Sequence, residues 1–205
     1  ADGDMEAAIE WLRKKGTATA EKKSSRTTSE GVIARHLAAD GKSGTLVEIN
    51  CETDFVAKNS EFINFAEEVS HLALDVSGKM EDILKSKMKN KKKVEENLID
   101  LVSKIGEKIT IRKSACFVND KLLNFSYTHA SIKKNIGKIG VLLSIETKKD
   151  KNDVMNLGKQ LAMQIASSSP LAIDKEGLDP NILKKEKEII TEELKNSGKD
   201  TKIVE

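Results

Sequence analysis

Cys51 and the histidines are the residues of this chain best suited to chemistry. A cysteine activated by a histidine can act as a nucleophile, with Cys51, Asp54 and His36 as the candidate set. Cys51 alternates with Val47 and Ile49 along a strand-like segment, which favours a buried structural thiol over a reactive one. The histidines fall in separate predicted elements without metal-ligand spacing: His36, His71 and His129. We therefore expect no enzyme activity, no catalytic residue, no metal and no cofactor.

Two glycine-lysine pairs partly resemble phosphate-binding loops. Gly41-Lys42-Ser43 has the ending of such a loop, but His36 stands where the motif requires its first glycine. Gly137-Lys138-Ile139 lacks both the upstream glycine and the final serine or threonine. The chain is not expected to bind a nucleotide by itself.

The lysine-rich segment from Lys85 to Lys93 is the best candidate for contact with nucleic acid. It has no interleaved aromatic residue that could stack on bases. The whole chain carries a formal net charge of only +2, which gives no general attraction for nucleic acid. A solvated surface is therefore favoured, and an RNA- or ribosome-associated binding module remains the alternative function.

Residues 51–56, Cys51-Glu52-Thr53-Asp54-Phe55-Val56, form a corner between a predicted strand and a predicted helix. By spacing alone, Asp54 is an N-cap and Phe55 packs on the sheet. Phe62 and Phe65 already supply the bulk of the helix face, so Phe55 and Val56 stand outside its register. Side chains in such a place are candidates for contact with a partner. Both interpretations stay open on the sequence.

The elements that position this corner follow from apolar periodicity. A helix over 4–15 ends at Gly16, and a hairpin turn at 40–44 joins two strands. A helix begins at the N-cap Ser60, and another covers about 94–105 before Gly106 and a closing strand. Two alternating strands and a helix then repeat the pattern up to Pro170, and residues 171–173 add a short strand.

The predicted fold class is therefore α+β, with two similar subdomains, each an antiparallel sheet covered on one face by helices. A helix from the N-cap Asp179 to about Asn196 carries only a narrow apolar stripe, which suits a protruding two-helix arm. The expected segments are a helix at 1–16, a linker at 17–28, subdomains at 29–119 and 120–178, and an arm at 179–205.

Composition agrees with a water-soluble, helix-rich chain, since 38% of the 205 residues are hydrophobic and 33% are charged. Two distant cysteines favour a reducing compartment over a disulfide scaffold. No apolar run is long enough for a membrane span, and no signal peptide opens the chain. We expect a cytoplasmic protein, of a bacterium or of an organelle's matrix or stroma, with no membrane partner.

The segment from Val47 to Asn59 closely resembles the signature of the translation elongation factor Ts family, which exchanges the nucleotide of elongation factor Tu. The similarity continues through most of the chain. Its other segments are 4–16, 29–31, 127–129, 136–142, 161–166 and Pro170. The resemblance implies a core of two α+β subdomains and a guanine-nucleotide exchange factor for translation elongation, with elongation factor Tu as partner and nucleic acid not expected.

The resemblance also implies site residues. Asp54 and Phe55, flanked by Thr53 and Val56, match the residues that enter elongation factor Tu between helices of its nucleotide domain. Ile105 and Gly106 fall where the family has further contacts, although a helix C-cap explains Gly106 equally well. His129 matches a histidine that contacts the partner from the second subdomain, and it could instead be structural.

Two departures from the family pattern are expected to matter. Residues 1–16 match only the end of the family's N-terminal helical module, and the returning arm helix with the C-terminal module would lie beyond Glu205. We therefore interpret the sequence as part of a longer protein, and we expect this part alone to bind the partner weakly. The resemblance allows a homodimer through the arm, but the two-helix arm is incomplete in this sequence, which argues against a homodimer of this chain.

Overall fold

The computed structural model describes residues 4–196, apart from a few side chains, and confirms the predicted α+β class. Contacts divide the chain into one compact unit that ends at Ser167 and a second that starts at Ser168. The helices are α1 (Met5–Lys23), α2 (Asp54–Ala57), α3 (Ser60–Asp75), α4 (Met80–Lys85), α5 (Val94–Ile105), α6 (Lys151–Ser168) and α7 (Pro180–Asn196). The strands are β1 (Glu30–Leu37), β2 (Ser43–Cys51), β3 (Thr110–Val118), β4 (Leu122–His129), β5 (Ile136–Gly137) and β6 (Ile139–Glu146).

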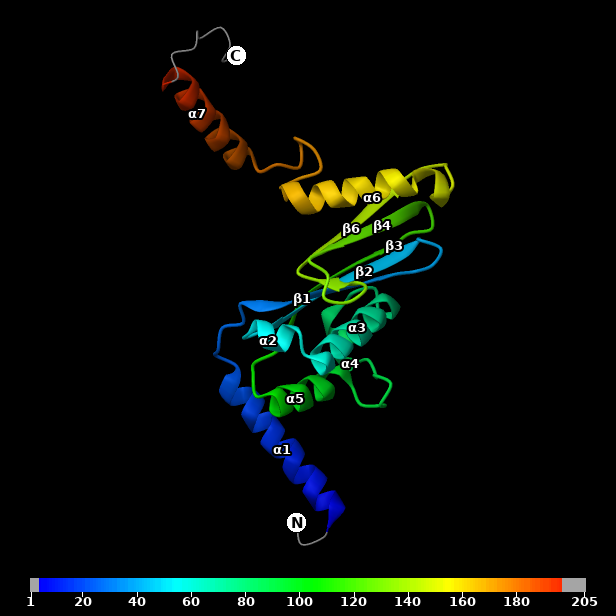
Figure 1. Ribbon diagram of the computed structural model, residues 1–205, viewed down its shortest axis with the longest axis vertical. Coiled ribbons are helices and arrows are strands. Elements are labelled where there is room, and N and C mark those ends of the chain that lie inside the picture. The colour runs from blue at the N-terminus through cyan, green and yellow to red at the C-terminus, as the bar shows by residue number, and fades with distance from the viewer. Residues whose placement is uncertain (1–3, 197–205) are drawn as a thin grey trace. The chain divides into compact units, whose positions relative to one another are not determined.

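The larger sheet of the first unit is antiparallel and has the order β3-β2-β1-β5. Helices α3, α4 and α5 lie on one side of it (Figure 1). As the alternation predicts, Val47, Ile49 and Cys51 of β2 are fully buried, in one core with Phe62 and Val69 of α3. This core fixes where β2 ends, and therefore where the corner begins.

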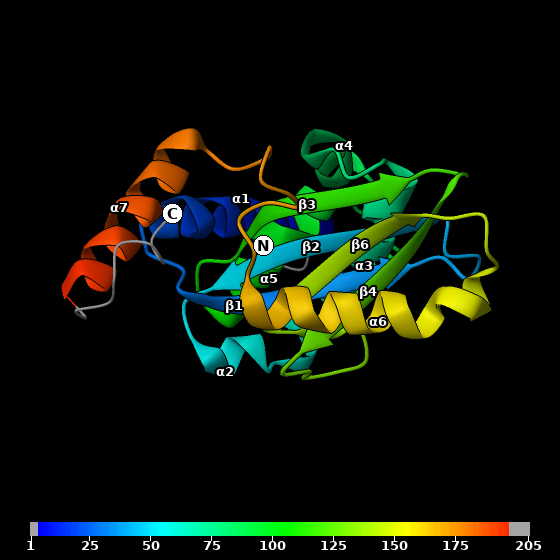
Figure 2. The same ribbon diagram turned by 90° about the horizontal axis from the view of Figure 1, so that it is seen from above.

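The smaller sheet, β4-β6, lies between α6 and the larger sheet (Figures 1 and 2). Phe125 of β4 meets Gly158 of α6 on one side, while Ser126 accepts a hydrogen bond from Arg35 of β1 on the other. Both faces are thus covered, contrary to the expectation of one. Asn124 is consequently fully buried although its position in the sequence reads as solvent-facing.

The strand β5 joins the two predicted subdomains. It comes from the segment expected to belong to the second one, yet it pairs with Ile33 and Ala34 of β1. The division into 29–119 and 120–178 stays a prediction.

Some predicted boundaries are wrong. Helix α1 continues through Gly16 to Lys23, because Gly16 is buried against Ile99 of α5 instead of ending the helix. The first part of the expected linker is therefore helical. Helix α3 is capped by Asn59 in place of Ser60, since the Asn59 side chain accepts from the N–H groups of Glu61 and Phe62.

Two expectations concern the second unit. Residues 171–173 form no strand. The predicted start of α7 is confirmed, because the Asp179 side chain accepts a hydrogen bond from the Asn181 N–H at 2.9 Å. The end of the expected arm, residues 197–205, and residues 1–3 of the expected first helix lie outside the described residues. No helix among residues 4–196 has the length and apolarity to cross a membrane.

Gly158→Ala is expected to destabilise the protein, because the new Cβ would lie 2.2 Å from Cγ of Phe125. We expect a net loss of about 1–3 kcal/mol in the free energy of unfolding, measured by urea denaturation. Gly16→Ala is the matched helical control, since its Cβ would lie 3.4 Å from Ile99. It should be neutral or stabilising by up to about 1 kcal/mol, and equal losses in both variants would contradict this packing.

Candidate functional site

The corner is a tight passage from β2 into the short helix α2. Thr53, and not Asp54 as predicted, is the N-cap: its side chain accepts from the Val56 N–H at 3.4 Å. Asp54 is the first helical residue, and its carboxylate lies 2.8 Å from Nζ of Lys58. The hydrogen bond and charge of Lys58 hold the pKa of Asp54 below its usual value. Asp54 therefore presents a negative charge at the start of α2.

The side chains of Phe55 and Val56 differ in burial. The Phe55 side chain is 81% exposed, so it does not pack on the sheet. Val56 is only 7% exposed and belongs to the core together with Ala57, contrary to the expectation that it stands outside. Only Phe55 of this pair offers an apolar surface to another molecule.

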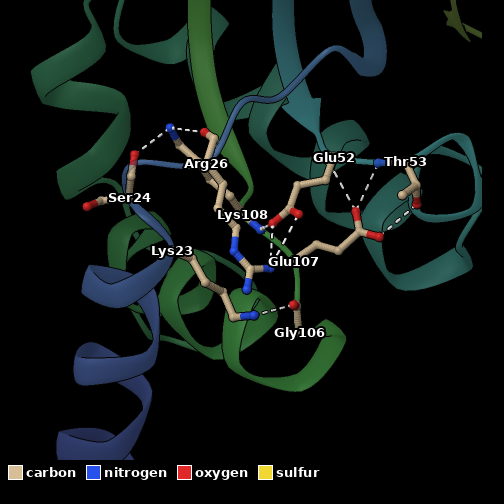
Figure 3. A network of polar contacts seen from close by, with 8 residues as sticks. All are labelled: Lys23, Ser24, Arg26, Glu52, Thr53, Gly106, Glu107 and Lys108. Atoms are coloured by element: carbon tan, nitrogen blue, oxygen red, sulfur yellow. Dashed lines mark hydrogen bonds and ion pairs between the residues drawn. The ribbon is translucent and has the colours of Figure 1, made fainter.

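Glu107, which the sequence analysis did not single out, holds the corner from the connection between α5 and β3. Its carboxylate accepts from the N–H groups of Glu52 and Thr53 at 3.2 and 3.0 Å. Its other oxygen accepts from the Thr53 hydroxyl at 2.7 Å (Figure 3). The contact spans more than fifty positions of sequence, and no local pattern indicates it.

Glu52 completes a reciprocal arrangement. Its carboxylate accepts from the Lys108 N–H at 2.6 Å and lies 3.4 Å from the guanidinium of Arg26. The Lys108 N–H, followed by Arg26, lowers the pKa of Glu52. The Lys108 ammonium donates to the carbonyls of Ser24 and Arg26, so the segment after α1 is bound to the same place (Figure 3).

Ile105 and Gly106 lie at the end of α5, beside Glu107. Ile105 is partly buried against the core. Gly106 is exposed, has a φ of 83°, and accepts a hydrogen bond at its carbonyl from Lys23. Its left-handed backbone ends the helix and turns the chain toward the corner. The structure thus brings these two predicted residues close to Thr53 through their neighbour Glu107.

His129 is exposed at the end of β4. Its Nδ1 lies 3.1 Å from the Tyr127 hydroxyl. Its carbonyl accepts from the Lys138 N–H, and the Lys138 side chain pairs with Glu30 at the start of β1. Because Glu30 is the register partner of Cys51, the backbone of His129 is tied to the strand that leads into the corner.

The rival chemical centres find no support. Burial, followed by the charge of Glu107, raises the pKa of the Cys51 thiol to about 11. Gly41 lies in the turn between β1 and β2, and a strand instead of a helix follows it. The ring centroids of His36 and His71 lie 3.9 Å apart with the rings tilted by 38°, a contact that the sequence did not predict. Among the described residues, no group of three acidic, histidine or cysteine side chains could hold a metal ion.

Cys51 should react slowly in the native protein. At pH 8 a thiol with a pKa of about 11 is ionised to roughly one part in a thousand, at least a hundredfold less than a free cysteine. A Cys116→Ser variant, which leaves Cys51 as the single thiol, should react with a disulfide reagent more than about a hundredfold faster in urea than in buffer. Equal rates would contradict the buried thiol.

The pH dependence of stability should contain a contribution from Glu52. Since its pKa is lower in the folded than in the unfolded protein, its stabilisation is complete above the ordinary value of about 4.3 and is lost as the pH falls through the folded pKa. Glu52→Gln should therefore be less stable than the parent at pH 7, and the difference should shrink toward pH 3. Urea denaturation at each pH measures this, and a constant difference would contradict it.

Comparison with known proteins identifies the family of the chain. Residues 52–205 match the family model described as Elongation factor TS. The chain is 39% identical over 204 residues to elongation factor Ts of Parvibaculum lavamentivorans. This similarity covers 99% of the chain and 66% of that relative. It is 40% identical over 205 residues to elongation factor Ts of Clostridium botulinum, covering 100% of the chain and 66% of the relative. The chain thus spans about two thirds of the length of such relatives, and it belongs to the elongation factor Ts family.

Proposed function

We propose that this chain is a guanine-nucleotide exchange factor for elongation factor Tu, acting in translation elongation through protein contacts and without an active site of its own. Family membership supports the partner. The observation that carries the proposal is Phe55, a large apolar ring that is 81% exposed on a helix whose ends are fixed. Such a side chain is suited to insertion between elements of another protein.

In this mechanism Phe55 enters the nucleotide domain of the partner as a wedge, and Asp54 adds a negative charge beside it. The factor must bind the nucleotide-free partner more tightly than the GDP form, and by linkage GDP must weaken its binding equally. Burial of one phenylalanine contributes about 1.5–3 kcal/mol, or one to two decades in affinity. A larger effect requires a second contact.

The second contact is proposed at His129, with Gly106 and the exposed part of Ile105 extending the first one. The Tyr127 hydroxyl beside the imidazole restrains the direction of His129. The Thr53 hydroxyl is occupied within the chain, and the Val56 side chain is buried, so both are assigned to support of the corner. In this proposal Phe55 acts as a wedge and His129 makes a second contact, so the partner is held at two points.

The alternative, an RNA-binding module at Lys85 to Lys93, is less well supported. Lys92 pairs with Asp100 at 2.7 Å and Lys93 with Glu95 at 3.1 Å, so part of the positive charge is already compensated. The Lys89 N–H donates to Glu68. These contacts describe a solvated loop held to neighbouring helices.

Phe55→Ala should slow factor-stimulated release of labelled GDP from elongation factor Tu, because the ring that separates the partner's helices is removed. The expected loss is roughly ten- to a hundredfold in the factor's stimulation at subsaturating concentration. Stopped-flow release of a fluorescent GDP analogue measures it, with the urea midpoint as a check that the fold is intact.

Phe117→Ala is the matched control, since Phe117 lies on β3 and is also exposed, at 42%. It should leave GDP release unchanged. If elongation factor Tu released GDP as fast with Phe55→Ala as with the parent, the wedge role would be excluded.

A further inference from the structure

We propose that Glu107 is a positioning residue for Phe55, holding the corner in the orientation that the exchange reaction requires. The proposal rests on the proposed function, because it concerns how the same surface is presented to elongation factor Tu. It assigns to Glu107 no contact with the partner. Its role is exerted through Thr53 and the first turn of α2.

The first step of the argument is that α2 cannot orient Phe55 alone. The helix has four residues, far fewer than an isolated helix needs for stability in water. The Phe55 ring is mostly in solvent and has little packing to fix its direction. The direction of the ring must therefore come from what holds the two ends of α2.

The C-terminal end is held by the core, where Val56 and Ala57 are buried. The N-terminal end is held by Glu107, which accepts from two successive N–H groups and from the Thr53 hydroxyl. The donation from this hydroxyl aims a lone pair of its oxygen toward the Val56 N–H, so the N-cap itself depends on Glu107. A further bond, from the Cys51 thiol to the Thr53 carbonyl at 3.2 Å, acts at the same residue.

The second step concerns the position of Glu107 in the chain. It directly follows Gly106, whose left-handed backbone turns the chain at the end of α5. The Glu52 carboxylate returns a bond to the Lys108 N–H, so the two segments exchange hydrogen bonds through adjacent residues (Figure 3). Glu107 therefore fixes Phe55 relative to Ile105 and Gly106, and joins two proposed contacts into one surface.

Two substitutions of Glu107 separate the effect of its side-chain length from the effect of its charge. Glu107→Gln keeps the length of the side chain and a carbonyl that accepts from both N–H groups, and it loses only the acceptor of the Thr53 hydroxyl. Glu107→Asp keeps the charge but is one methylene too short to reach them. A positioning role predicts that the Gln variant retains more of the stimulated GDP release than the Asp variant, and that Glu107→Ala resembles Asp. If Asp retained more than Gln, the charge would act directly and the proposal would be overturned.

The loss in Glu107→Ala is expected to be roughly tenfold in stimulated GDP release, the cost of charged hydrogen bonds lost at the corner. A double-mutant cycle with Phe55→Ala tests the route. Once Phe55 is absent, Glu107→Ala should add less than about a twofold further loss. If the losses of the two single variants multiplied fully in the double variant, Glu107 would act independently of Phe55, and the proposal would be overturned.

A local readout without elongation factor Tu completes the test. In Glu107→Ala, the amide protons of Glu52 and Thr53 should exchange with solvent about tenfold faster or more, while those of Val47 and Ile49 in the core keep their rates. Unchanged exchange at Glu52 and Thr53 would overturn the proposal.

The two proposals fail differently. Full activity of Glu107→Ala beside a slow Phe55→Ala would remove the role of Glu107 and leave the wedge in place. Full activity of Phe55→Ala would remove the wedge, and the positioning role with it.

Discussion

The orientation of one exposed apolar ring, that of Phe55, depends on hydrogen bonds exchanged between the two segments that hold the corner. Glu107 accepts from the backbone of Glu52 and Thr53, and Glu52 accepts from the backbone of Lys108. Hydrogen bonds to charged groups are stronger than neutral ones, and several of them converge on two consecutive residues here. Polar atoms set the direction of the corner together with the buried Val56 and Ala57, because the exposed Phe55 ring has little packing of its own.

The rest of the fold supplies the anchors of this exchange. The end of β2 is placed by Ile49 and Cys51 in the core, and the end of α5 is placed by Leu101 and Val102. Lys23 and Lys108 bind the end of α1 and the segment after it to the same connection. A disturbance in any of three distant parts of the sequence would therefore reach Phe55.

Local patterns predicted much of this structure and little of the site's support. The alternation Val47, Ile49, Cys51 identified the buried face of β2, and the Asp179-Pro180 pair identified the start of α7. The helix ends were harder to predict, because Thr53 and Asn59 compete with the equally suitable caps Asp54 and Ser60. Periodicity also separated Phe55 from the core but wrongly grouped Val56 with it, since a four-residue helix has no register of its own to extrapolate. The bonds of Glu107 and the contact of His36 with His71 join residues far apart in sequence, which a single sequence does not reveal.

The short strand β5 has a consequence for the order in which the chain can be completed. It pairs with β1 across about a hundred residues, from Ile33 to Gly137. During synthesis from the N-terminus, β1 can pair with β2 early, but its other edge stays open until residue 137 has emerged. An open edge is a template for pairing with other chains. Pairing of β5 thus also marks the moment at which this edge of the nascent sheet is covered at Ile33 and Ala34.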